Sequence, residues 1–261
     1  MDNPVFVTEK HLARTFDGGV YDDAYEAVEQ YRTATRYASR HNVKSGATAS
    51  ALDLPRGRLR GWIDDGGAPD AINCIETARE YGWLEVTYED TQFTALNALV
   101  ANVFSGGSIA HHHYRPSFVL NNRGEDSHVV DALELAGVDY ELVGDRPGRG
   151  DELRPSTDGT TLGRVLATLG APVGPKAEQR LELPAYLEDA PNDVKRLFVV
   201  CYLENRAHEH KSIIKFREER NADYLESLRA LIESVAGEPV THSEKNIILS
   251  KAASDALGTV V

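Results

Sequence analysis

The amino-acid sequence predicts an α+β protein, in which an N-terminal helical domain precedes a duplicated domain of helices and strands with pseudo-twofold symmetry. Three observations predict it. Residues 1–83 contain helical patterns and no strand pattern. An apolar stretch at residues 99–109, LVANVFSGGSI, has its pattern repeated at residues 199–207, VVCYLENRA. Each stretch is then followed by the same order of elements, which indicates an internal duplication.

Both apolar stretches predict helices that can pack closely. Small residues lie four apart in each, Ala101 and Ser105 in the first and Cys201 with the larger Asn205 in the second. Residues at this spacing share one helix face, and small side chains let two backbones approach. The sequence therefore predicts that the two helices meet at one seam between similar halves.

The remaining elements follow from periodicity. Residues 148–153, GRGDEL, are interpreted as a loop without a function. After the first apolar stretch the patterns predict a strand at 111–120, a helix at 126–136, an extended segment at 139–144 and a helix at 161–170. After the second they predict a strand at 210–219, a helix at 223–237, a strand at 245–250 and a helix at 251–258. The predicted organisation is a helical domain at 1–83, a linker at 84–93 and a duplicated domain at 94–261, with repeat one at 94–170, a connecting segment at 171–192 and repeat two at 193–258.

The connecting segment carries a family resemblance. It contains Gly174-Pro175-Lys176 and then Leu183-Pro184-Ala185-Tyr186. A glycine/proline turn, a lysine and a Leu-Pro-x-aromatic phrase before the second apolar helix resemble the LAGLIDADG homing endonucleases. The resemblance covers residues 94–258 and implies an αββαββα order in each repeat.

The resemblance also implies where catalytic acids would lie. The family holds divalent metal ions with an acidic residue at the eighth position of each motif helix, where the metals activate water for phosphodiester cleavage. Here those positions are Gly106 and Arg206. Neither ligates magnesium, so we expect no catalytic residue, no metal and no cofactor. The chain then resembles the WhiA family of transcription regulators, with the helix-turn-helix first and not last. The alternative is an active endonuclease that uses other acids, such as Glu204 or Glu209.

Residues 45–63 predict a helix-turn-helix that follows a long helix at 21–41 and precedes a supporting helix at 69–83. Ser45 is the expected N-cap of a helix at 47–52, and a break at 53–55 leads to a recognition helix at 56–63, with Pro55 at its first position. Residues 40–62 hold five cations and one acid, a local excess that suits phosphate and guanine contacts. The alternative is a solvated helical surface. The candidate DNA-binding residues are Lys44, Thr48, Arg56, Arg58 and Arg60.

The two predicted strands at 111–120 and 210–219 add further candidates. Alternation places His111, His113 and Arg115 on one face of the first strand. It places Lys211, Lys215 and Arg217 on one face of the second. In the family these sheets face the major groove, and the alternative is again a solvated face. Consecutive strand residues point to opposite faces, so the histidine run at 111–113 is not expected to bind a metal.

The overall charge of the chain opposes the interpretation that it binds DNA. The net charge is −13 and only eight of the 28 basic residues are lysine. Lysine-poor acidic surfaces are typical of halophilic proteins, and an acidic protein that binds other proteins and not DNA is the second alternative.

Cys74 and Cys201 predict neither a disulfide nor a zinc site. The sequence shows no signal-peptide pattern and no apolar run of membrane-spanning length. We therefore expect a cytoplasmic protein without membrane contact that binds double-stranded DNA as a monomer with an internal pseudo-dyad or as a homodimer.

Overall fold

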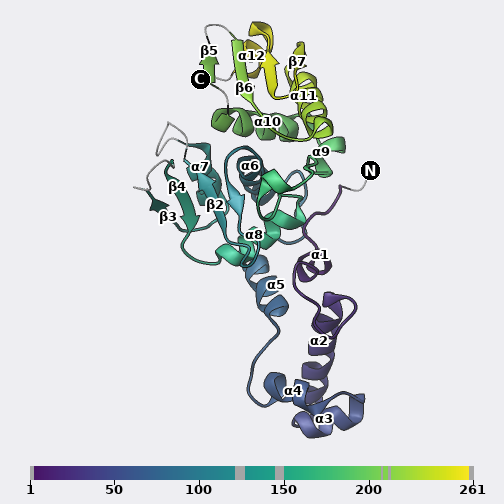
Figure 1. Cartoon of the computed structure of the whole chain (residues 1–261). Helices are drawn as coiled ribbons and strands as arrows, with labels where there is room; N and C mark the ends of the chain where they lie inside the picture. Colours follow the sequence, from purple (N-terminus) through teal and green to yellow (C-terminus); the bar gives the residue numbers. More distant parts are fainter. Residues whose placement is uncertain (1–2, 121–126, 145–149, 207, 211–212, 259–261) are drawn as a thin grey trace. The chain divides into compact units, whose positions relative to one another are not determined.

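A computed structural model describes residues 3–120, 127–144, 150–206, 208–210 and 213–258 (Figure 1). The chain divides into two compact units. One unit is Val7–Leu84, and the other is Met1–Phe6 together with Glu85–Val261.

The Val7–Leu84 unit is helical. Helices α2 (Ala24–His41), α3 (Ser45–Leu52) and α4 (Arg56–Ile63) contribute Ala34, Ala49 and Leu59 to a small core. Asp53 ends α3 in the left-handed region with φ of 53°, which turns the chain toward α4. The predicted N-cap of the first helix is wrong, because Ser45 lies inside α3 and its hydroxyl donates to Asp64 at 2.5 Å. Pro55 is the N-cap of α4 and not, as predicted, its first residue. The helices are α1 (Glu9–Ala13), α2 (Ala24–His41), α3 (Ser45–Leu52), α4 (Arg56–Ile63) and α5 (Asp70–Glu80).

The other unit contains the same series of elements twice. Each series runs αββαββα, and each forms a four-stranded antiparallel sheet, with orders β1-β2-β4-β3 and β5-β6-β8-β7. The predicted duplication and α+β class are confirmed. Repeat one is α6 (Thr91–Ser105), β1 (Ser108–Ile109), β2 (Pro116–Val119), α7 (His128–Leu135), β3 (Tyr140–Val143), β4 (Glu152–Pro155) and α8 (Gly159–Thr168). Repeat two is α10 (Asn192–Arg206), β5 (His208–His210), β6 (Ile213–Arg217), α11 (Ala222–Ala236), β7 (Val240–His242), β8 (Asn246–Leu249) and α12 (Lys251–Leu257).

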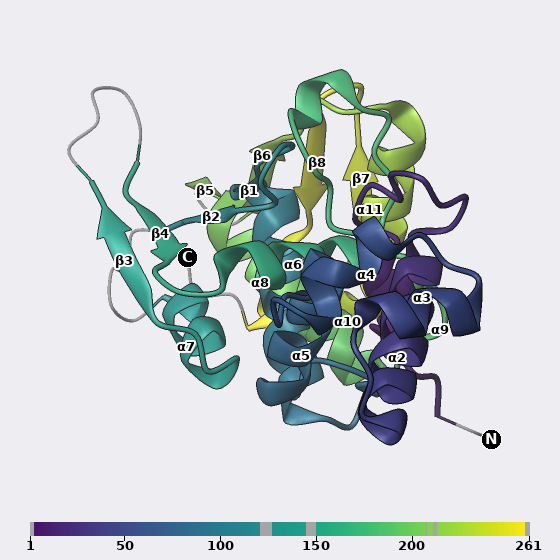
Figure 2. The same ribbon diagram turned by 90° about the horizontal axis from the view of Figure 1, so that it is seen from below.

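The two apolar helices α6 and α10 pack against each other, as Figures 1 and 2 show. Ala101 and Cys201 are buried on these helices. At the C-terminal ends, Nδ2 of Asn205 donates to the Ser105 hydroxyl at 2.9 Å. Residues at the same position of the repeat therefore meet across the seam, which is the contact that a pseudo-twofold axis requires.

The connecting segment is anchored to both seam helices. It includes a 3₁₀ turn, η2 (Lys176–Glu178), and a short helix, α9 (Tyr186–Asp189). The Tyr186 hydroxyl donates to Oδ1 of buried Asn97 at 2.6 Å, and Nδ2 of Asn97 donates to the Val194 carbonyl at 2.9 Å. The Tyr186 ring also packs against Phe6 and Phe93. The aromatic residue of the Leu-Pro-x-aromatic phrase thus fixes the segment onto α6 and α10.

Several predicted elements are wrong. The strand predicted at 111–120 exists only as β2, because residues 111–113 form the turn after β1 and Tyr114 has φ of 50°. The loop predicted at 148–153 ends in strand β4. Strands β1, β5 and β7 and helix α1 were not predicted. Residues 84–93 are not simply extended, since Val86 forms a β-bridge with Phe6 and α6 begins at Thr91. Among the described helices, none combines the length and apolarity needed to cross a membrane.

Candidate nucleic-acid interface

The two positions at which the sequence resemblance predicted metal-binding acids, 106 and 206, lie at the end of the seam. Gly106 caps α6, and Arg206 is the last residue of α10. The hydrogen bond between Ser105 and Asn205 joins the residues just before them. A Cβ atom added to Gly106 would lie 3.2 Å from the Cβ atom of Val119, so little space remains for a larger side chain.

Arg206 is bound to a buried carboxylate. Its Nε atom donates to Oε2 of Glu218 at 3.0 Å, and its second guanidinium nitrogen donates to the Arg217 carbonyl at 2.8 Å. Glu218 is 1% exposed and also accepts a hydrogen bond of 2.7 Å from the Tyr202 hydroxyl. Nε of Arg220 lies 3.4 Å from the other carboxylate oxygen, at ion-pair distance. Burial raises the pKa of Tyr202 well above its usual value, which keeps this phenol protonated as a donor.

Lys176, from the Gly174-Pro175-Lys176 turn, closes the C-terminal end of α6. Its ammonium donates to the carbonyls of Val103, Phe104 and Gly107 at 2.6, 3.2 and 2.9 Å. A cation at this point offsets the negative end of the helix dipole. Burial, with the nearby Arg220 and Arg206 guanidinium groups, lowers the pKa of Lys176 to about 8, while Glu218 acts in the opposite direction.

The end of the seam therefore holds three cations, Lys176, Arg206 and Arg220, around one buried carboxylate, Glu218. This excess of positive charge disfavours a divalent cation. Within the described part of the chain, no group of three or more histidine, cysteine, aspartate or glutamate residues is placed to hold a metal ion.

Glu204, the acid considered for an active endonuclease, contacts repeat one. Its Oε2 lies 2.8 Å from Nδ1 of His128, at the start of α7, and both side chains are 14% exposed. The carboxylate is thus engaged across the interface between the repeats. The side chain of Glu209, the other acid considered, lies outside the described residues.

The predicted residues of α3 and α4 differ in exposure. Lys44, Arg56 and Arg60 are exposed. Arg58 is half-buried, donates to Oε1 of Gln30 at 2.7 Å and lies over the Tyr21 ring.

Thr48 is fully buried, and its hydroxyl donates to the Lys44 carbonyl at 3.1 Å. The prediction that Thr48 contacts DNA is wrong, because its side chain supports α3 from within. Lys44, Arg56 and Arg60 remain candidates.

In the second sheet the predicted alternation of β6 is present. Lys215 and Arg217 are exposed, whereas Ile214 and Phe216 are buried. Lys211, the third predicted cation of this strand, lies outside the described residues.

In the first sheet, Arg115 is exposed just before β2. His111 and His113 are exposed in the turn before β2, so their predicted position on a strand face is wrong. Both remain near the end of the sheet, and His113 and Arg115 line one cavity of about 370 Å³.

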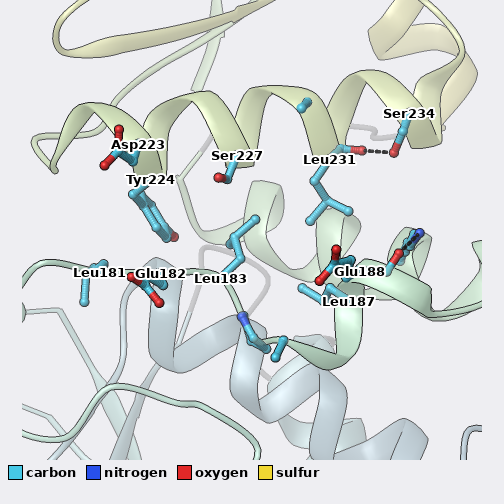
Figure 3. Close-up of a pocket in the computed structure, with 14 residues that line it drawn as sticks. Leu181, Glu182, Leu183, Leu187, Glu188, Asp223, Tyr224, Ser227, Leu231 and Ser234 are labelled. Atoms are coloured by element: carbon cyan, nitrogen blue, oxygen red, sulfur yellow. Dashed lines mark hydrogen bonds between the residues drawn. The ribbon is translucent and has the colours of Figure 1, made fainter.

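A larger cavity of about 510 Å³ lies between the connecting segment and α11 (Figure 3). Leu183 and Leu231 point into it in Figure 3, and its lining includes the carboxylates of Glu182, Glu188 and Asp223 against one lysine, Lys195. The acidic lining does not suit a phosphate.

The αββαββα order, the two four-stranded sheets and the paired seam helices define an α+β protein with a duplicated core, as the resemblance to the LAGLIDADG fold predicted. Among solved structures, the chain is similar to the N-terminal LAGLIDADG domain of DUF199/WhiA, with a TM-score of 0.43, 8% sequence identity, and coverage of 67% of this chain and 87% of that chain. No family model and no curated protein matches the sequence.

Proposed function

We propose that this chain is a sequence-specific double-stranded DNA-binding protein, a transcription regulator on a homing-endonuclease-like core that does not cleave DNA. The observation that carries the proposal is the cation cluster at the end of the seam. Arg206 stands at a position where the family holds an acid, and its guanidinium is bound to Glu218. Gly106 stands at the other position and offers no ligand.

The exposed cations of α4, together with Lys44 just before α3, support DNA binding. Arg56 and Arg60 lie one helical turn apart on α4, and Lys44 precedes α3. A short helix with this pair of arginines suits a recognition helix in the major groove, where arginine contacts guanine edges and phosphates. The net charge of −13 favours the rival function, a protein-interaction module without DNA binding.

The test is selection of bound duplexes from a randomised DNA pool by the full chain in a buffer with a metal chelator. We expect one sequence to be enriched. The dissociation constant of that duplex is then compared between the parent and the double variant Arg56→Ala/Arg60→Ala. The double variant should bind at least about tenfold more weakly, because a good base contact contributes about 1–3 kcal/mol.

The control is Arg180→Ala/Lys251→Ala, which removes two exposed cations that each pair with a nearby aspartate. It should bind within about twofold of the parent, because paired surface charges contribute little. Failure to enrich any duplex favours the protein-interaction module. Equal binding by Arg56→Ala/Arg60→Ala overturns the assignment of α4. Magnesium-dependent cleavage of supercoiled DNA that Glu204→Ala abolishes overturns the non-enzymatic assignment.

A further inference from the structure

The duplicated fold allows the two sheets to be compared position by position. Phe118 on β2 and Phe216 on β6 are both buried at the same place in their repeats. The strand registers then match residues on the open faces of the two sheets, which are the faces opposite Phe118 and Phe216. The open face bears half-buried Ser117 and Val119 on β2 and exposed Lys215 and Arg217 on β6. The matched pairs are Arg115 with Ile213, Ser117 with Lys215, Val119 with Arg217, Glu141 with Thr241, Glu152 with Asn246 and Arg154 with Ile248.

On the open face of repeat one, charges cancel within the protein. Glu152 accepts hydrogen bonds from the Ser117 hydroxyl at 2.6 Å and from Arg154 at 3.0 Å. Arg154 on β4 lies directly opposite Glu141 in the register with β3. Arg115, Arg154 and Glu141 also line the same cavity of about 370 Å³. Two arginines and two glutamates at the matched positions leave this face without net charge.

On the open face of repeat two, the matched positions hold Lys215, Arg217 and no acid. Lys215 is exposed and pairs across the strands with Ile248, which carries no charge. Arg217 engages Glu219, which lies beyond the end of β6. The open face of repeat two therefore carries a charge of +2 at positions where repeat one carries zero, and Lys215 is its more available cation.

We propose that DNA lies against the sheet of repeat two and not against the sheet of repeat one, so that the symmetric fold binds its target from one side. This inference rests on the proposed function. Phosphates are attracted to an uncompensated cation such as Lys215, whereas Arg154 is already bound to Glu152. Glu141 and Glu152 on the open face of repeat one repel the DNA backbone. The pseudo-dyad of the fold would then not appear as a palindrome in the DNA site.

The experiment uses the full chain and the duplex enriched by selection. Two double variants are compared, Lys215→Ala/Arg217→Ala and its charge-matched control Arg115→Ala/Arg154→Ala. The repeat-two variant should bind at least about tenfold more weakly, and the slope of log K against log salt should fall by about one to two, because each phosphate contact contributes about 0.9 to the slope. The repeat-one variant should bind within about threefold of the parent.

A gain of affinity provides the second measurement. Glu141→Thr with Glu152→Asn gives repeat one the residues that repeat two holds at those positions, and binding should tighten by at least about threefold. Circular dichroism confirms that each variant is folded. Equal weakening by the two double variants overturns the one-sided contact. No tightening by the glutamate variant overturns the repulsion by Glu141 and Glu152 from which that contact is argued. If Arg56→Ala/Arg60→Ala weakens DNA binding and neither sheet variant does, the one-sided contact is wrong and the proposed function stands. If the parent chain binds no duplex, the proposed function itself is refuted.

Discussion

Replacing Glu218 with glutamine should destabilise the unit that contains the two repeats. Glutamine keeps the volume of the side chain and one oxygen that can accept from Tyr202. It removes the negative charge that faces Arg206 and Arg220, with the Lys176 ammonium close by. Three cations would then share a mostly buried region without a carboxylate.

The magnitude follows from the burial of the partners. Removing one member of a buried ion pair costs about 3–5 kcal/mol, since the other charge stays without compensation. The Arg206 and Arg220 side chains are 31% and 18% exposed, so water relieves part of this cost. We expect a loss of about 2–4 kcal/mol in the free energy of unfolding. For a unit of this size that loss lowers the melting temperature by roughly 5–15 °C.

The assay is thermal unfolding followed by two signals. Trp62 and Trp83, the only tryptophans in the sequence, both lie in the Val7–Leu84 unit, so tryptophan fluorescence reports that unit while far-ultraviolet circular dichroism reports both. The matched control is Glu219→Gln, which removes an exposed carboxylate one residue away and should leave the transition unchanged. A shift below about 2 °C for Glu218→Gln, or an equal shift for the control, would refute the structural role of the buried carboxylate.

Two further predictions concern the same unit. Burial lowers the pKa of Lys176 to about 8, so between about pH 8 and the unfolded value of 10.5 the unfolded chain binds a proton that the folded chain does not. The free energy of unfolding should therefore rise through that window by up to about 1.4 kcal/mol per pH unit, and Lys176→Met should remove this part of the slope. Urea unfolding of the parent and the variant at about pH 7 and about pH 9.5 measures the slope. The same pH dependence in both proteins would contradict the burial of a charged Lys176. Gly163→Ala should cost at least about 3 kcal/mol, because its Cβ atom would lie 1.6 Å from the Tyr114 carbonyl oxygen. The control is Gly57→Ala on α4, whose added Cβ atom meets nothing within 4 Å and which should be neutral or stabilising by about 0.5–1 kcal/mol. Similar urea midpoints for the two alanine variants would contradict the close approach at Gly163.

The long apolar elements were predictable from the sequence and the short ones were not. Helices α6 and α10 show sustained apolar runs with small residues four apart, and these runs revealed the duplication. Strands β1 and β7 have two and three residues, too few for an alternating pattern. The error at 111–120 has a tertiary cause, because Tyr114 turns with φ of 50° and its carbonyl lies against α8 at Gly163. A glycine within the apolar helix pattern at 161–170 was a signal of that close approach.

The candidate site was predictable only in part, for a similar reason. The exposed cations of α4 and β6 follow from the helical and alternating patterns, which assign a face to each residue. Glu218 lies in the charged run Arg217-Glu218-Glu219-Arg220, which has the composition of a solvated surface. Its burial depends on Arg206 from α10 and on Tyr202 one turn earlier, and no local pattern reports such partners. Thr48 was misassigned because sequence alone does not separate a small polar residue inside a helix pair from one that faces solvent.

Aspartates at the two positions at the end of the seam would not readily form a metal site, for different physical reasons. An aspartate at position 106 would need Val119 to move, because its Cβ atom would lie 3.2 Å from the Cβ atom of that residue. An aspartate at position 206 would remove the guanidinium from Glu218 and place a second carboxylate beside it, and two close carboxylates disfavour ionisation of both. Lys176 would still occupy the carbonyls at the end of α6. A pair of metal ligands at this point therefore requires changes at 119 and 218 as well as at 106 and 206, so single substitutions destabilise the seam before they create a site.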